Sequence, residues 1–374
     1  MNILRIRLLT IHIYKCWKNN RSVSKVLADF AVSALPFLLW LILFNSVNMI
    51  PNNVKPRINV RLLLRLDDYI FNNFMGIISC IILTNLISLG LFNKFYKETF
   101  SSIDYTKFNL PLTIVPKRSR KYTRSSTKVA GDLLLHNLPL IFISFSWFIL
   151  KIVFSFKEPI TKFKNLLALI FFIMGHFLIL PITIYYLYLF QYPGVLKRFI
   201  IILGLQNLII VLIHIFFPNV PPIYIQYYGE NKIPSYESPG YSEGLTRIDI
   251  NPFVQYIILY VKSIEFGILP SLHSSISLLI TFFLCYLIKS IMVRVGIVIY
   301  LLLQIWSSLY LDHHWKFDIL VSIIFSSGFF LLIKSDLDNL KTNFLHNYKL
   351  NYNGSTMGMR LFKGTKFESL FNPL

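Results

Sequence analysis

The stretch GILPSLHSSISLLITFFLCYLIK (267–289) joins a short polar motif to a long apolar run. An apolar run of about 18–20 residues is long enough to cross the hydrocarbon core of a bilayer as a helix. The whole chain has this character, since 55% of its 374 residues are hydrophobic and only 14% are charged. Soluble domains average about 25% charged residues. The sequence therefore predicts a membrane protein whose polar motifs lie where apolar runs begin.

Further apolar runs accompany this one along the chain. They are continuous rather than alternating, which disfavours a transmembrane β-barrel. We therefore expect an all-α, polytopic membrane protein with about six to eight transmembrane helices. The predicted spans are 29–49, 71–93, 132–155, 166–190, 198–217, 271–289, 291–310 and 316–334.

Charge and composition divide the chain into regions. Basic residues dominate the N-terminus, which we expect to form an interfacial helix, and they also dominate the C-terminal tail. The loop 218–270 differs, because it is rich in Pro, Gly and Tyr; long loops of this kind usually carry function. The predicted regions are a basic N-terminus (1–28), a membrane region with a basic loop at 94–131 (29–165), a second membrane region with the loop 218–270 (166–335), and a basic tail (336–374).

The net charge of +20 is explained by the topology of a membrane protein. Lys and Arg accumulate on the cytosolic side, and no nucleic-acid recognition motif accompanies them here. With eight spans, the loop 94–131 and the basic tail are cytosolic. The loop 218–270 then shares the opposite, non-cytosolic side with His273 and His314. The three cysteines have no metal-ligand spacing and predict no disulfide framework.

Two motifs at span borders supply the candidate chemistry: PSLHS (270–274) and YLDHHWKFD (310–318). The i,i+4 spacing is expected to place His314 and Asp318 on one helical face, where the carboxylate orients the imidazole for nucleophilic attack. His273 is expected at the same membrane depth, as a general acid. Helix N-termini favour anions, so both helices would present backbone N–H groups to a phosphate. Ser271 and Ser274 would add hydrogen bonds.

Two alternatives use the same residues. The histidines could be interfacial side chains with Asp318 as a cap, although ionisable groups in membrane segments are usually functional. His273, His314 and Asp318 could also bind zinc, but they match no standard metal motif. His313 is interpreted as a packing residue or a donor behind the site. His176 and His214 lie within spans and are interpreted as satisfied packing residues.

These motifs resemble the lipid phosphatase and phosphotransferase superfamily called PAP2, so the resemblance implies a PAP2-like helical core and a PAP2-like catalytic domain over 166–335. His273 matches the first histidine of that superfamily, and His314 and Asp318 match its second element. Ser308 stands where the superfamily carries an Arg that binds phosphate. This departure argues against an ordinary phosphatidate phosphatase.

Within the superfamily, the chain resembles fungal inositol phosphorylceramide synthase. The resemblance covers about 26–72 and 166–335, whereas about 74–165 matches nothing in that family. The segments that carry it are YPGVLKRF (192–199), FPNVPPIY (217–224), SPGYSEGLTRID (238–249), GILPSLHSS (267–275) and YLDHHWKFD (310–318).

This resemblance implies the reaction and its setting. Phosphoinositol would move from phosphatidylinositol to ceramide with release of diacylglycerol, without a metal or another cofactor. It also implies a Golgi membrane, a lumenal active site and a small regulatory membrane subunit. A PAP2-type lipid phosphate phosphatase or a related sphingolipid phosphotransferase is the alternative. Candidate cations for the phosphate are Arg247, which lies in a matched segment, and Lys262 and Lys316.

Overall fold

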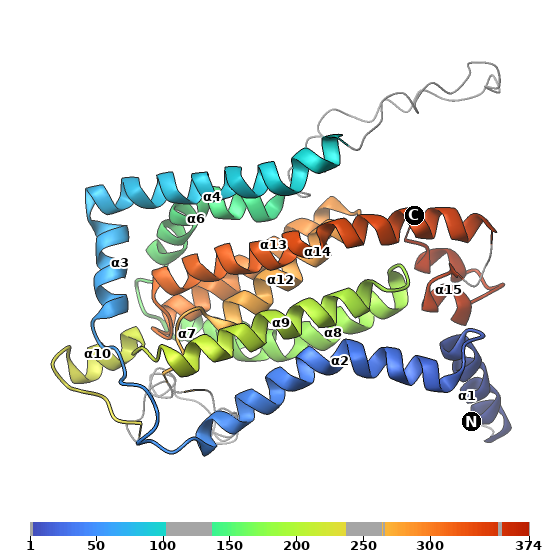
Figure 1. Ribbon diagram of the computed structural model, residues 1–374, viewed down its shortest axis with the longest axis horizontal. Helices are drawn as coiled ribbons and strands as arrows, with labels where there is room; N and C mark the ends of the chain where they lie inside the picture. Colours follow the sequence, from blue (N-terminus) through green and yellow to red (C-terminus); the bar gives the residue numbers. More distant parts are fainter. Residues whose placement is uncertain (1–2, 102–136, 237–263, 265, 351–353, 374) are drawn as a thin grey trace.

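The computed structural model describes residues 3–101, 137–236, 264, 266–350 and 354–373. Each of the eight predicted spans forms helix, and the segments run alternately between the two ends of an elongated bundle (Figure 1). Six described helices are long and apolar enough to cross a membrane, and α8 and α12 are shorter apolar helices. The chain is therefore an all-α, multi-pass membrane protein, as predicted. The spans are α2 (Val23–Ser46), α4 (Phe74–Ser101), α6 (Leu138–Ser155), α7 (Lys162–Leu169) continued through a π-helical turn (Ile170–Gly175) into α8 (His176–Phe190), α9 (Val195–Phe216), α12 (Leu272–Leu287), α13 (Ile291–Tyr310) and α14 (Lys316–Leu350).

Short helices cover the two ends of this bundle. The predicted N-terminal helix is present as α1 (Ile3–Lys18), and the Arg360 guanidinium ties it to the C-terminal α15 (Met357–Leu361) by donating to the Cys16 carbonyl. Its contact with a membrane surface stays a prediction. The remaining short helices are η1 (Val47–Met49), α3 (Leu62–Asn72), α10 (Pro222–Tyr228) and η6 (Glu368–Phe371).

The hydrophobic core is centred on α12, whose residues from Ser274 to Cys285 are all buried. Side chains of α6, α9, α13 and α14 surround it, among them Ile143, Phe199 and Ile323. Residues from both sides of the predicted boundary at 165 thus contribute to one core. The division into four regions stays a prediction.

Serines join α12 to α14 along their crossing. The Ser322 hydroxyl donates to the Ser271 carbonyl at 3.3 Å, and one turn later the Ser326 hydroxyl donates to the Ser275 carbonyl at 3.2 Å. Small polar residues at such a spacing let two helix backbones approach closely in an apolar environment. The contact fixes the start of α14 beside the start of α12.

The alternating directions place the two sequence motifs at one end of the bundle. The starts of α12 and α14 and the ends of α6, α9 and α13 lie at the end that also holds α3 and α10, and α1 and α15 lie at the other (Figure 1). This confirms the prediction that His273 and His314 share one end.

Candidate functional site

The two motif histidines line one small cavity. His273 is the second residue of α12, and His314 lies in the turn between α13 and α14. Together with His214 of α9 they line a cavity of about 40 Å³, whose remaining wall is Phe44, Ile264, Gly267 and Leu272. Residues 41 positions apart in the sequence are therefore brought to one point, as the sequence predicted.

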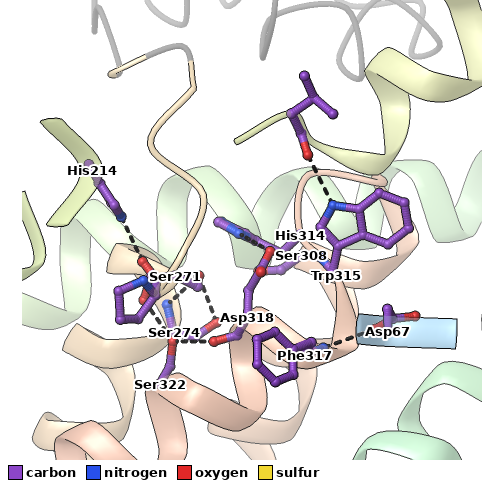
Figure 2. Close-up of polar contacts among 12 residues, drawn as sticks. Asp67, His214, Ser271, Ser274, Ser308, His314, Trp315, Phe317, Asp318 and Ser322 are labelled. Atoms are coloured by element: carbon purple, nitrogen blue, oxygen red, sulfur yellow. Dashed lines mark hydrogen bonds and ion pairs between the residues drawn. The ribbon is translucent and has the colours of Figure 1, made fainter. Parts of the chain in front are cut away.

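Asp318 lies behind His314 in the arrangement shown in Figure 2. Its Oδ2 is 3.5 Å from Nδ1 of His314, and both side chains are buried. The same oxygen accepts a hydrogen bond from the Trp315 backbone N–H at 2.9 Å. The expectation of one helical face is wrong in detail, because α14 begins only at Lys316. Asp318 reaches back from the first helical turn, as in one half of a capping box, and so meets the residue just before the helix.

A second carboxylate, which the sequence analysis missed, also caps α14. Asp67 of α3 accepts the Phe317 backbone N–H at 3.0 Å and binds the Lys316 ammonium at 2.6 Å. The start of α14 therefore does not offer the Trp315 and Phe317 N–H groups to a phosphate, which corrects that expectation. Lys316 is held in an ion pair with Asp67.

The sequence pattern around Asp67 could have revealed this second cap. Asp67 lies four residues after Leu63 and four before Phe71, so its carboxylate falls within the buried stripe of α3.

Hydroxyl groups cap the start of α12. The Ser271 Oγ accepts the Ser274 backbone N–H at 3.3 Å and donates to the Ser274 Oγ at 3.1 Å. Both serines are buried, and they flank Leu272 and His273 in the sequence; Figure 2 shows them close to each other. Ser308 is buried too, and its hydroxyl donates to the Gln304 carbonyl at 3.0 Å. The position that carries an Arg in the PAP2 pattern thus holds a short side chain that bonds to its own helix.

His214 and His313 lie closer to the cavity of His273 and His314 than expected. His214 is hydrogen-bonded through Nε2 to the Pro270 carbonyl at 2.8 Å, so it is satisfied as predicted, but it lines the cavity of His273. A Cβ on Gly267 would lie 2.6 Å from the His214 ring, so only glycine fits there. His313 stacks on Phe172, and the Phe172 ring also stacks on His273, each pair with centroids 4.7 Å apart.

Three predicted residues cannot be located. Arg247 and Lys262 lie outside the described residues, as does the side chain of His176. Within the described part of the chain, no three His, Cys, Asp or Glu residues are grouped so that they could hold a metal ion.

The environment of His314 favours a neutral imidazole. Burial lowers the pKa of His314 well below its ordinary value, and the neighbouring His313 and His214 lower it further, against a backbone hydrogen bond with Ile268. A neutral ring has a free lone pair at neutral pH, which a nucleophile requires.

A second cavity adjoins His314. It has a volume of about 270 Å³ and is larger and more polar than the first. Two ion pairs line it: Lys316 with Asp67, and Lys157 with Asp312, whose Nζ and Oδ1 are 2.5 Å apart. His314 is thus the side chain shared by the two cavities.

Two histidines on one small cavity, with a carboxylate 3.5 Å from one of them, are the groups that phosphoryl transfer through a histidine would need. In agreement, residues 151–332 match the sequence profile of the PAP2 superfamily. The matched segment includes His273, His314 and Asp318.

Individual proteins that are similar to this chain carry more specific names than the superfamily does. Inositolphosphotransferase 1 of Saccharomyces cerevisiae is 26% identical over 304 residues, which cover 74% of this chain and 56% of that protein. Inositol phosphorylceramide synthase of Candida albicans is 33% identical over 40% of this chain and 31% of that protein. The catalytic subunit AUR1 of the same enzyme in S. cerevisiae is 31% identical over 35% of this chain and 32% of that protein. The chain thus spans about half of the first relative and a third of the others. No solved structure matches it significantly.

Proposed function

We propose that this protein is an inositol phosphorylceramide synthase, a phosphotransferase that moves phosphoinositol from phosphatidylinositol to ceramide and releases diacylglycerol. The observation that carries the proposal is the shared cavity of His273 and His314 with Asp318 behind His314. The names of the three relatives support phosphoinositol as the transferred group and ceramide as the acceptor.

The geometry supports His314 as the nucleophile. Because Nδ1 faces Asp318, the opposite ring nitrogen, Nε2, is the atom that attacks phosphorus. The carboxylate fixes the tautomer and stabilises the positive ring as the N–P bond forms. The bond from phosphorus to the diacylglycerol oxygen breaks in the same step, and His273 donates the proton that this oxygen needs.

The second half of the reaction uses the same groups in reverse. His273, now neutral, removes the proton from the primary hydroxyl of ceramide, and that oxygen attacks the phosphohistidine. The N–P bond breaks, His314 is restored, and inositol phosphorylceramide leaves. Contacts of Ser271, Ser274, Arg247 and Lys262 with substrate remain part of the proposal, as do a Golgi location, a lumenal site and a small regulatory subunit.

A related activity has its own support. The match to inositolphosphotransferase 1 covers 74% of this chain, nearly twice the share covered by the C. albicans synthase. Phosphoinositol transfer to a sphingolipid other than ceramide would use the same site and steps. Hydrolysis, in which water replaces the acceptor as in a lipid phosphate phosphatase, is less favoured, because Ser308 stands at the Arg position.

Membranes that contain the protein, given phosphatidylinositol with a tritiated inositol ring, test the proposal. With ceramide we expect labelled inositol phosphorylceramide, and none from the His314→Ala variant. A label found only on sphingolipid acceptors that already carry a head group would favour the related activity. Release of labelled inositol phosphate without an acceptor would favour the phosphatase, and undiminished transfer by His314→Ala would refute the mechanism.

A further inference from the structure

The cavity with the two ion pairs lies against His314 but is lined by residues to which no step of the reaction has been assigned. Its charged wall comes from four separate parts of the chain: Asp67 on α3, Lys157 after α6, Asp312 after α13 and Lys316 at the start of α14. The rest of the lining is His314, Trp315, Gln226 and the apolar residues Leu64, Phe154, Pro222, Ile225 and Leu309. Packing of distant segments is needed to build such a cavity.

The lining has a definite chemical preference. Each lysine is within about 2.6 Å of a carboxylate, so the two positive and two negative charges balance. A balanced wall attracts an anion weakly, which argues against a phosphate in this cavity. It offers both carboxylate acceptors and ammonium donors, and a ligand with several neighbouring hydroxyl groups uses both kinds at once. The cavity therefore fits a neutral polyol.

The two cavities beside His314 differ in the ligand that they fit. The small one holds His273 and the apolar side chains of Phe44, Ile264 and Leu272. The large one holds the four charged residues. A phosphodiester at His314 has one substituent that leaves as a lipid alcohol and one that stays as a polyol. The larger cavity, of about 270 Å³, has room for a polyol ring, whereas the small one, of about 40 Å³, has room for little more than the leaving oxygen beside His273.

We propose that the charged cavity binds the inositol ring of the donor, while the lipid oxygen that leaves points towards His273. This assignment rests on the proposed function, since it takes phosphatidylinositol as the donor. Asp312 and Lys157 are then specificity residues that select the head group, and the ring stays in the cavity through both halves of the reaction.

Asp312 is the best position for a test. Its backbone has a φ of 56°, a left-handed conformation that Asp and Asn tolerate better than other side chains. Asp312→Asn therefore keeps the backbone conformation and removes only the charge. Because this change leaves the Lys157 ammonium without its carboxylate, the double variant Lys157→Gln/Asp312→Asn is made as well. Glu158→Gln is the matched control, since Glu158 is exposed and outside the cavity lining.

The experiment measures transfer to ceramide in detergent micelles with two donors, phosphatidylinositol and phosphatidylglycerol. For the Asp312 variants we expect a KM for phosphatidylinositol that is raised about tenfold, the typical effect of losing a hydrogen bond to a charged group. The KM for ceramide should not change, and the preference for phosphatidylinositol over phosphatidylglycerol should fall. Inhibition by free inositol 1-phosphate should weaken by the same factor, and Glu158→Gln should behave as wild type.

The outcomes separate this inference from the proposed function. Wild-type protein without any phosphoinositol transfer would overturn the function and, with it, the ring assignment. Active wild-type protein with unchanged donor preference and unchanged inositol 1-phosphate inhibition in both Asp312 variants would overturn the ring assignment alone. If Asp312→Asn does not fold, as judged by thermal unfolding, the same measurements on the double variant test the ring assignment.

Discussion

The starts of α12 and α14 carry the two candidate catalytic histidines, but they are capped by different chemistry. At α12 the cap is the neutral Ser271 hydroxyl, next to Ser274. At α14 the caps are the carboxylates of Asp318 and Asp67. A helix N-terminus has a positive partial charge that favours anions, and a carboxylate cap uses that charge whereas a hydroxyl cap leaves it.

Because of this difference, the two helix starts are expected to act differently on a bound phosphate. The α12 end keeps its affinity for an anion, so it is the end expected to stabilise the charge of the transferred phosphate. At the start of α14, the carboxylates of Asp318 and Asp67 already neutralise this partial charge. Asp318 lies 3.5 Å from His314, and Asp67 lines the charged cavity in its ion pair with Lys316.

Replacing the nucleophile at the α14 end should have the largest effect. We expect His314→Ala to lower transfer at least about 10⁴-fold, as for the loss of other covalent nucleophiles. The matched control is the neighbouring His313→Gln, which should keep transfer within about tenfold of wild type, because His313 stacks on Phe172 instead of facing the carboxylate. Steady-state transfer of labelled phosphoinositol measures both. A larger loss of transfer in His313→Gln than in His314→Ala would identify His313 as the nucleophile.

Replacing the acid at the α12 end should have the next largest effect. We expect His273→Ala to lower transfer from phosphatidylinositol about 10³-fold, within the range for general acid catalysis. A p-nitrophenolate leaving group needs no proton, so the variant should release a first equivalent of nitrophenolate in a burst at nearly the wild-type rate. Later turnovers should stay slow, because His273 is also the base of the second half of the reaction. Absence of this rescue would argue against an acid role, while His314→Ala should fail with both donors.

Removing a carboxylate cap at the α14 end should cost stability. Asp67→Asn leaves Lys316 buried without its partner, and we expect a loss of about 3 kcal/mol in the free energy of unfolding, as for other broken buried pairs. Reversible unfolding in mixed micelles measures the loss. The double variant Asp67→Asn/Lys316→Met removes the stranded charge and should recover part of the stability. An Asp67→Asn variant as stable as wild type would mean that the pair does not stabilise the start of α14, and equal stability of the two variants would mean that the stranded charge does not cause the loss.

Placing a carboxylate at the α12 end should have the smallest effect. Ser271→Asp can still cap the helix, but it adds a negative charge beside the expected phosphate position, and we expect transfer to fall about tenfold. The matched neutral variant is Ser271→Asn, which should stay within about threefold of wild type. Equal activity of the two variants would show that the α12 end does not stabilise the phosphate.

Local patterns in the sequence predicted much of the fold. Apolar runs long enough to span a bilayer identified the six membrane-length helices in the described part of the chain, because the hydrocarbon core forces each span to satisfy its own backbone. Alternation of the spans then placed His273 and His314 at one end. The exact start of α14 was not predictable, since the two carboxylates that cap it act through tertiary contacts as well as local ones.

Composition and short motifs were enough to predict a multi-pass membrane protein and to single out His273, His314 and Asp318 as candidate catalytic residues. The surroundings of these residues depend on how the helices pack. Asp67 meets Lys316 across 249 positions, and Lys157 meets Asp312 across 155. Pairings at such separations come from helix packing, which local residue patterns do not encode, and so the charged cavity beside His314 became visible only in the folded chain.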